Sequence, residues 1–486
     1  MTENRTHIFL WLFTLTVFIL SLVPLLVQDG MFIDGVLYAG ISKNLANNLG
    51  SLWQPHFTQT FSNEFYGHPP LVFGIQSLFF KVLGKSIYVE RFFSLSNGIL
   101  SLVGISLIWR LNFKDTPFKK FDWLPVLLWI ITPVISASFR NNLLVNTVTV
   151  FTLFSSYFII KAIIENKQIF LFIGSLFIAL VFFSKGPFGL FPLVISFVYW
   201  LCFSRISFMK NLKIFAILLF SSVGLILLLF LIQPESLNNI SRYLDIQLLP
   251  SLQNELYTRS SRFYILIRLF LELLPSILIT LAVIFTFRKR LKNNNDIKFG
   301  QAAFFILIGL CASIPILVTL KQHPNYIVPS IPFFVIGLSV IIVPFIKDIL
   351  EMIKSRTEKK LRIFSIILFS LSLLFSFSFI GKSGGADGLI AGILGKHSQN
   401  KDKLHDVYIL SSIIPEGTII SVNKNFPRDS ELRNYLGRIG YISVDWNSEH
   451  EFILTDTKSM DELPSDEYRE VPNLTLIKYK LFKRVK

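Results

Sequence analysis

Long apolar stretches constrain this chain more than any other feature of its sequence. A helix of about 20 apolar residues is long enough to cross the hydrocarbon core of a bilayer. Only 16% of the residues are charged, whereas soluble domains have roughly 25%. We therefore predict an all-α polytopic membrane bundle of about eleven transmembrane helices. The predicted spans are 8–27, 92–110, 123–139, 142–160, 168–183, 187–203, 212–232, 264–287, 300–320, 326–346 and 363–380.

Two apolar stretches need separate comment. The range 8–27 is not followed by a small-residue cleavage site, so we expect a retained helix rather than a removed signal peptide. The run 71–84 is short and is interrupted by Gln76 and Lys81. Its length favours an interfacial or re-entrant segment over a span.

The distribution of charge predicts how the spans are oriented. With a cytoplasmic N-terminus, the cytoplasmic segments hold 21 Lys and Arg against 8 Asp and Glu, and the outer segments before residue 382 hold 11 against 8. Short loops rich in Lys and Arg remain in the cytoplasm. We therefore predict a multi-pass protein of the cell (inner) membrane with its C-terminal domain outside the cytoplasm. The net charge of +16 is then a topology signal, and no nucleic-acid partner is expected.

Three polar segments face outward in this topology, namely 28–91, 233–263 and 382–486. We predict a transmembrane domain over 1–381, with the first two segments forming its active-site face, and an extracytoplasmic domain over 382–486. Short apolar runs separated by turn residues, with a helical pattern over 429–440, are typical of a small α/β domain. Cys202 and Cys311 lie inside apolar runs, so neither a disulfide nor a zinc site is expected.

Polar side chains at the outer ends of the spans are the candidate functional residues, because polar groups at membrane depth are costly. Asp34 follows the first span and lies near the start of a helical pattern over 33–49. An acid at that position is either an N-cap or first-turn residue stabilised by the helix dipole, or a general base that accepts a proton from an acceptor hydroxyl. The sequence pattern alone leaves both interpretations of Asp34 open.

Five short motifs follow one another along the chain, all on the predicted outer face. They are DGVLYA (34–39), HPPL (68–71), ER (90–91), FSKGP (183–187) and KQHPNYIVP (321–329). In this order they resemble the polytopic C-type glycosyltransferases that use a polyprenyl-phosphate-linked sugar. The most similar group is the superfamily of protein O-mannosyltransferases and lipid A aminoarabinose transferases, and the resemblance covers about residues 8–380.

The resemblance implies that a sugar moves from a polyprenyl-phosphate donor to a hydroxyl of an acceptor lipid, glycan or protein. It implies that Asp34 is the catalytic base. Glu64 is a second candidate acid, although Gly67 occupies the position where many relatives carry a carboxylate. Basic side chains would bind the donor phosphate and stabilise the charge that develops on it. These candidates are His68, Arg91, Lys185, Arg262, Lys321 and His323, with Tyr38 and Tyr326 as substrate-binding residues.

Other interpretations are open for several of these residues. Arg262 could be a solvated loop charge, and His323 and Tyr326 could be interfacial anchors. No metal constellation is apparent in the sequence and no cofactor is assigned, although the acidic residues of the first loop could bind a divalent metal.

The alternative function is a transporter or flippase for a lipid-linked sugar. Transporters usually place ionisable groups near the bilayer midplane and often contain repeats. Here no repeat is visible and the ionisable residues lie at helix ends, except for Glu272, which is half way along its predicted span. We therefore favour a glycosyltransferase.

Overall fold

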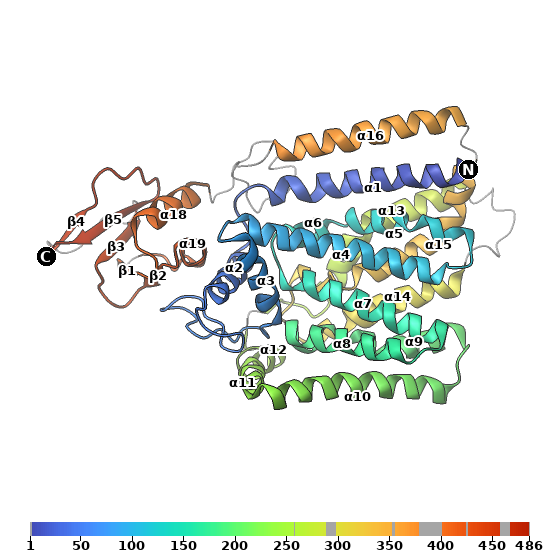
Figure 1. Cartoon of the computed structure of the whole chain (residues 1–486), viewed down its shortest axis with the longest axis horizontal. Helices are drawn as coiled ribbons and strands as arrows, with labels where there is room; N and C mark the ends of the chain where they lie inside the picture. The colour runs from blue at the N-terminus through green and yellow to red at the C-terminus, as the bar shows by residue number, and fades with distance from the viewer. Residues whose placement is uncertain are drawn as a thin grey trace.

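The computed structural model of the chain describes residues 2–256, 258–287, 298–351, 355–378, 401–423, 426–456 and 467–485. These residues form a bundle of long helices that run side by side, with a smaller unit of helices and strands at one end (Figure 1). The predicted fold class, a helical membrane bundle with a small α/β C-terminal domain, is confirmed. The domain boundary predicted at residue 382 lies outside the described residues.

Within the described ranges, nine helical segments are long and apolar enough to cross a membrane. Their helices are α1 (Thr2–Leu26), α4 (Tyr88–Asn112), α7 (Leu144–Glu165), α8 (Ile169–Lys185), α10 (Phe208–Ile232), α13 (Tyr264–Phe287), α14 (Phe299–Ser313), α15 (Ile331–Glu351) and α16 (Ser355–Phe377). The N-terminal end of α1 lies at the opposite end of the bundle from the C-terminal unit (Figure 1).

Two of the eleven predicted spans are not single long helices. The range 123–139 is divided into α5 (Trp123–Ile130) and α6 (Pro133–Phe139), and the axis bends by 78° between them. Pro133 begins α6 because it cannot donate the backbone hydrogen bond that would continue α5. The described ranges thus contain nine candidate spans, or ten when the bent pair, which includes the 3-10 helix η1 (Pro117–Phe121), counts as one.

The range 187–203 is the second difference. It contains two short 3-10 helices, η2 (Gly186–Gly189) and η3 (Phe191–Val194), before α9 (Ile195–Phe203). Pro187 and Pro192 each lie at the start of a 3-10 helix, and a proline inside a continuous α-helix would break its hydrogen bonding. The apolar helix that results is too short to count as a span.

Short helices gather at the end of the bundle that faces the C-terminal unit (Figure 1). They are α2 (Ile33–Ala46), α3 (Leu71–Leu83), α11 (Pro234–Tyr243) and α12 (Leu249–Leu252), with the π-helix η4 (Leu244–Leu248) before α12. α3 covers the run 71–84 and is a separate short helix, as its length predicts. Two 3-10 helices, η6 (Ile314–Val318) and η7 (Pro324–Ile327), join α14 to α15.

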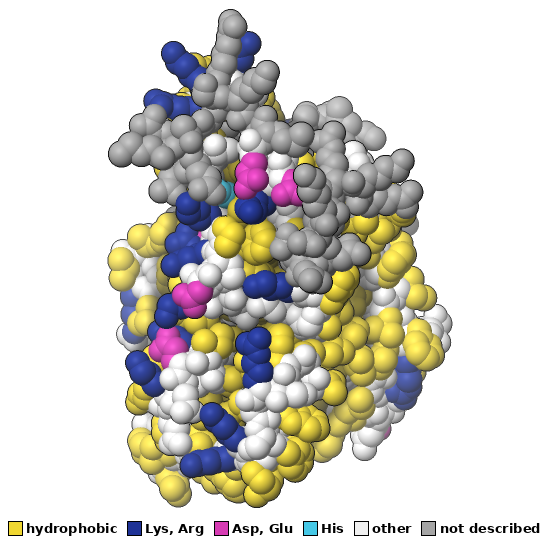
Figure 2. Space-filling view, turned by 90° about the vertical axis from the view of Figure 1, so that its right-hand side faces the viewer, with side chains coloured by type: hydrophobic (Ala, Val, Ile, Leu, Met, Phe, Trp, Pro, Cys, Tyr) yellow, Lys and Arg dark blue, Asp and Glu magenta, His cyan; other side chains and the backbone are white. Residues whose placement is uncertain are grey.

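Aromatic side chains are divided between the core of the bundle and its surface. Trp109, Trp129 and Phe304 are fully buried, whereas Phe220 and Phe285 are exposed. Apolar side chains cover much of the end of the bundle opposite the C-terminal unit, and Lys and Arg side chains are scattered among them (Figure 2). The phenylalanines therefore serve both packing and an apolar outer surface.

The C-terminal unit is built on one five-stranded sheet with the order β2-β1-β3-β5-β4. β1 pairs parallel with β2 and β3, and β5 pairs antiparallel with β3 and β4. The strands are β1 (Ile419–Val422), β2 (Ser443–Asp445), β3 (Phe452–Asp456), β4 (Tyr468–Glu470) and β5 (Tyr479–Arg484), and the helices are α18 (Lys401–Ile413) and α19 (Ser430–Gly440). α19 begins where the side chain of Asp429 accepts two backbone N–H groups, which is a regular N-cap.

Candidate active site

Two adjoining cavities lie at the end of the bundle that carries the short helices. The larger has a volume of about 640 Å3 and the smaller of about 290 Å3. They share a wall that is lined by His68, Lys185, Gln247, Lys321 and Tyr326. Four of these five side chains are predicted site residues, so the fold brings together motifs from distant parts of the chain.

Asp34 lies in the first turn of α2 and lines the larger cavity. Its carboxylate forms no hydrogen bond or ion pair with the part of the chain that the structure describes. The N-cap residue of α2 is Phe32, so Asp34 does not cap the helix. Burial raises the pKa of Asp34, and the positive charges of Lys185 and Lys321 oppose that rise only in part.

Lys185 is the last residue of α8, and its side chain is only 8% exposed. Its ammonium lies 4.5 Å from the ring centre of Tyr326 and 4.9 Å from that of Phe188. Among the described residues it has neither a carboxylate partner nor a hydrogen-bond acceptor. A buried cation without an anion is costly, so this ammonium is poised to bind an anionic group.

The turn after Lys185 depends on a glycine. Gly186 has a φ of 67° and a ψ of −148°, a backbone conformation that is essentially restricted to glycine. A Cβ atom at this position would lie 2.7 Å from the hydroxyl oxygen of Tyr243. The glycine therefore lets α11 approach the end of α8, and the Tyr243 hydroxyl donates to the carbonyl of Lys185 at 3.3 Å.

Lys321, His323 and Tyr326 come from the connection between α14 and α15 and line the larger cavity. Burial lowers the pKa of Lys321, and the carboxylate of Asp34 partly counteracts this effect. Burial and nearby positive charges lower the pKa of His323 to about 4. The same causes hold the pKa of His68 well below its ordinary value.

Both histidines are therefore neutral near pH 7, and the positive charge of the shared wall comes from its two lysines. The Nδ1 atom of His68 is buried without a hydrogen-bond partner among the described residues. Its ring packs edge-on against Tyr38, with 5.8 Å between the ring centres. Tyr38, the other predicted substrate-binding residue, also lines the larger cavity.

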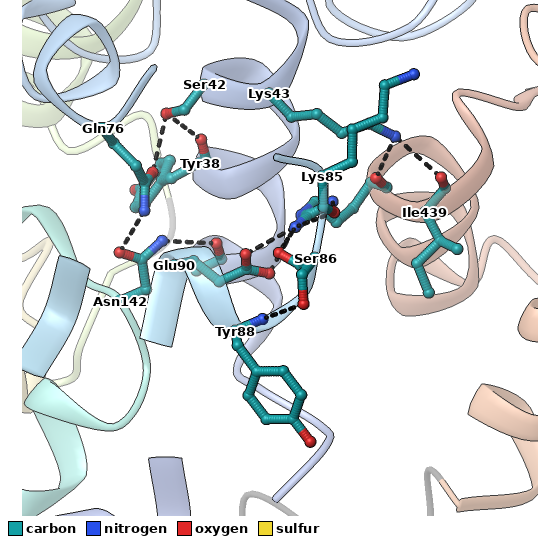
Figure 3. Close-up of polar contacts among 12 residues, drawn as sticks. Tyr38, Ser42, Lys43, Gln76, Lys85, Ser86, Tyr88, Glu90, Asn142 and Ile439 are labelled. Atoms are coloured by element: carbon teal, nitrogen blue, oxygen red, sulfur yellow. Dashed lines mark hydrogen bonds and ion pairs between the residues drawn. The ribbon is translucent and has the colours of Figure 1, made fainter. Parts of the chain in front are cut away.

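A buried polar network joins α2 to α3 and to the segment before α7 (Figure 3). The hydroxyl of Ser42 donates to Gln76 of α3 at 2.9 Å, and the Gln76 amide donates to Asn142 at 2.9 Å. The Asn142 amide then donates to the carbonyl of Gly35 at 3.2 Å. The residue next to Asp34 is thus tied to the segment that precedes α7.

Comparisons with known proteins identify the fold. Residues 67–232 match the family model described as dolichyl-phosphate-mannose-protein mannosyltransferase. No curated protein matches the sequence. The fold is similar to that of ArnT from Cupriavidus metallidurans bound to undecaprenyl phosphate, with a TM-score of 0.65 and 13% identity over 98% of this chain and 97% of ArnT.

Two further solved structures have the same fold. ArnT in the apo state gives a TM-score of 0.63 at 14% identity, over 98% of this chain and 97% of ArnT. The oligosaccharyltransferase of Archaeoglobus fulgidus in the apo form gives 0.55 at 13% identity, over 90% of this chain and 64% of that enzyme. This chain has the C-type glycosyltransferase fold. The resemblance predicted from the five motifs is thereby confirmed.

On this fold, three predicted site residues lie away from both cavities. Glu64 is exposed and accepts a hydrogen bond from the hydroxyl of Tyr66 at 2.8 Å. Arg91 is buried and donates to the carbonyls of Gly30 and Arg140. Arg262 is exposed and donates to the carbonyl of Leu317 at 3.1 Å and to that of Val318.

The structure adds cavity-lining residues that the motifs do not indicate. Tyr243 of α11 and Gln247 of η4 come from the segment between α10 and α13. Arg268 and Glu272 also line the larger cavity, and their side chains form an ion pair at 2.5 Å. Opposite charges four residues apart in an apolar span are a signal that could have indicated this pair. Within the described residues, no three His, Cys, Asp or Glu side chains are placed to hold a metal ion together.

Proposed function

We propose that this chain is an integral-membrane glycosyltransferase that moves a sugar from a polyprenyl-phosphate donor to an acceptor hydroxyl. The observation that carries the proposal is the buried ammonium of Lys185, which has no anionic partner in the described chain and lines both cavities. The description of the matched family names a dolichyl-phosphate sugar, and the similar ArnT structure contains undecaprenyl phosphate. Both are consistent with a lipid phosphate as the missing anion.

The two cavities suit the two halves of such a donor. The smaller one is lined largely by apolar side chains, including Phe188, Leu248 and Ile316, which can accommodate the start of a polyprenyl chain. The larger one contains Asp34 and the polar residues that can bind a sugar and its acceptor. The shared wall then receives the phosphate, because it contains both Lys185 and Lys321.

The proposed step is one displacement at the anomeric carbon. Asp34 accepts the proton of the acceptor hydroxyl, whose oxygen forms a bond to that carbon. The bond between the carbon and the phosphate oxygen breaks, and its electron pair leaves with the polyprenyl phosphate. Lys185 and Lys321 stabilise the negative charge on the departing phosphate. The raised pKa of Asp34 makes its carboxylate a stronger base than an exposed aspartate.

Glu272, the one feature of the sequence that favoured a transporter, is fixed in place. One of its carboxylate oxygens accepts the backbone N–H of Val134 at 2.6 Å, and the other pairs with Arg268. Both carboxylate oxygens therefore take part in contacts between neighbouring elements, which favours a structural role for Glu272. The transferase remains the better proposal.

A turnover assay tests the proposal. The polyprenyl-phosphate sugar that accumulates in cells lacking this protein is incubated with the purified protein and cell-envelope extract, and released polyprenyl phosphate is measured. Lys185→Met removes the charge but keeps an unbranched side chain, so the donor KM is expected to rise about tenfold to a hundredfold. Thermal stability should not fall, because the buried charge is unpaired.

The matched control is Lys161→Met. Lys161 also places its ammonium over an aromatic ring, that of Phe170 at 4.3 Å, but at the other end of α8. This variant should keep the wild-type KM. Intact donor after incubation with the wild-type protein, together with its transfer across vesicle membranes, would favour the flippase instead.

A further inference from the structure

The backbone on the N-terminal side of Asp34 is bound by a helix from the other end of the chain. The hydroxyl of Tyr435, on α19, accepts the N–H of Met31 at 2.7 Å and donates to the Met31 carbonyl at 3.1 Å. The amide of Asn434 donates to the carbonyl of Ile33 at 3.1 Å. The residue directly before Asp34 is therefore attached to the C-terminal unit.

Apolar packing reinforces these hydrogen bonds. Met31 and Val36 are buried, and both belong to the same hydrophobic cluster as Val407 and Leu436 of the C-terminal unit. Asp34 thus lies between two side chains that are part of the core of that unit. The first loop and the C-terminal unit share one hydrophobic core.

The far end of α2 is bound to α19 as well. Lys43 is buried and donates to the carbonyls of Arg438 and Ile439 at 3.0 and 2.9 Å (Figure 3). The guanidinium of Arg438 in turn pairs with the buried carboxylate of Glu90 at 2.7 Å, at the start of α4. α19 consequently holds α2 at both ends and is itself anchored to the bundle.

The position of Asp34 depends on these backbone contacts because its own side chain forms no hydrogen bond with the described residues. Its carboxylate has no hydrogen-bond partner among the described residues, and the N-cap residue Phe32 provides no side-chain cap. The position of the carboxylate therefore depends on the backbone of residues 31–35. α19 binds this backbone at Met31 and Ile33, and Asn141 and Asn142 of the bundle bind it at Phe32 and Gly35. A general base must lie within about 2.6–3.2 Å of the group it deprotonates, and a displacement of about 1 Å can lower the rate about a hundredfold.

We propose that the C-terminal unit is the positioning frame of the active site, and that Tyr435 and Asn434 are positioning residues for Asp34. This inference rests on the proposed role of Asp34 as the base. It gives the C-terminal unit a role in the chemical step that does not require it to bind substrate. Donor binding depends on Lys185 and Lys321, which lie on other elements, so the frame affects turnover rather than donor affinity.

Tyr435→Phe in the full-length protein tests the inference, because it removes one hydroxyl and keeps the ring. We expect kcat to fall about tenfold or more, while the donor KM stays within about twofold of wild type. Asn434→Ala, which removes the bond to Ile33, should give the same pattern and provides a second measurement if one variant accumulates poorly. The acid limb of the kcat profile should change in both variants, since the surroundings of the Asp34 carboxylate change.

Tyr468→Phe is the matched control. Tyr468 is a buried tyrosine of the same unit, and its hydroxyl donates to the carbonyl of His450 at 2.8 Å without contacting the first loop. The Tyr468→Phe variant should lose about as much stability as Tyr435→Phe but keep the wild-type kcat. An equal fall of kcat in Tyr468→Phe and Tyr435→Phe, or no fall in either, would overturn the inference.

The inference and the proposed function fail in different ways. If Asp34→Asn turns over normally, Asp34 is not the base and the proposed function is wrong in its central residue. If Asp34→Asn is inactive while Tyr435→Phe and Asn434→Ala are fully active, only the positioning frame is refuted.

Discussion

The surroundings of Asp34 differ from those of an acid that caps a helix. A capping acid accepts backbone N–H groups, as Asp429 does at the start of α19. Asp34 accepts none from the described chain and faces the larger cavity with two lysines nearby. The Asp34 carboxylate therefore contributes little to the hydrogen bonding of the fold.

Asp34→Asn is expected to abolish most of the turnover without affecting folding. Loss of a positioned base lowers a rate about a hundredfold to ten-thousandfold, and the asparagine keeps the size of the side chain. Release of polyprenyl phosphate by the purified variant measures the effect, with the thermal midpoint as the folding readout. Asp402→Asn, which changes another first-turn acid, on α18, should have wild-type activity. Wild-type turnover by Asp34→Asn would show that the base is elsewhere.

The pH dependence of turnover follows from the same charges. The base must be deprotonated to act, so the rate rises with pH through the pKa of Asp34, and the raised pKa moves this limb above the ordinary aspartate range. The pKa of His323 is lowered to about 4 and that of His68 is also depressed, so both histidines stay neutral across neutral pH. His323→Gln should therefore leave the shape of the kcat profile between about pH 6 and 8 unchanged. A limb near pH 6.5 that disappears in this variant would contradict the neutral state.

At the scale of elements, glycines at helix ends decide how closely the site can assemble. Gly186 and Gly84 follow α8 and α3 with similar backbone angles, φ 67° and ψ −148° against φ 83° and ψ −160°. A Cβ at Gly84 would meet nothing within 4 Å, whereas one at Gly186 would meet the Tyr243 ring. Substitutions at these two glycines therefore distinguish the effect of backbone strain from that of a steric clash.

Gly186→Ala should be more harmful than Gly84→Ala. Both substitutions carry a backbone cost of about 1–3 kcal/mol, but only the first forces Tyr243 and the end of α8 apart. We expect a lower thermal midpoint for Gly186→Ala and also a raised donor KM, because Lys185 is the neighbouring residue. Gly84→Ala should change the midpoint alone. Equal donor KM values in the two variants would mean that the contact with Tyr243 does not position Lys185.

Site residues that belong to short local motifs could be predicted from the sequence. Contacts between distant parts of the chain could not. The motifs around Asp34, His68, Lys185 and Lys321 mark helix ends, so the order of spans was enough to place them on one face. The contacts of Arg91 and Arg262 could not be predicted from the motifs, because their guanidinium groups donate to carbonyls far along the chain. The attachment of α19 to α2 joins residues about 400 positions apart and leaves no pattern in the sequence.

At the scale of the whole molecule, the C-terminal unit and the short helices lie at one end of the bundle, and the N-terminal end of α1 lies at the other (Figure 1). Both cavities are lined in part by these short helices, through Asp34 of α2 and Tyr243 of α11. Exposed basic residues lie away from the site, with Lys119 and Lys120 in η1 and Lys210 and Lys213 in the first two turns of α10. Short basic loops favour the cytoplasm. We therefore propose that the cavities open on the extracytoplasmic side, as the charge distribution predicts.

Cysteine labelling tests this orientation in intact cells. Ser412 is exposed on α18 and Lys119 is exposed in η1, so each can be replaced by cysteine in a background where Cys202 and Cys311 are serine. A membrane-impermeant maleimide should label Ser412→Cys in intact cells after any outer barrier is opened, and Lys119→Cys only after the membrane is lysed. The cysteine-free background is the control for unspecific labelling. The reverse pattern would place the lysines of the shared wall on the cytoplasmic side, where an extracytoplasmic acceptor could not reach Asp34.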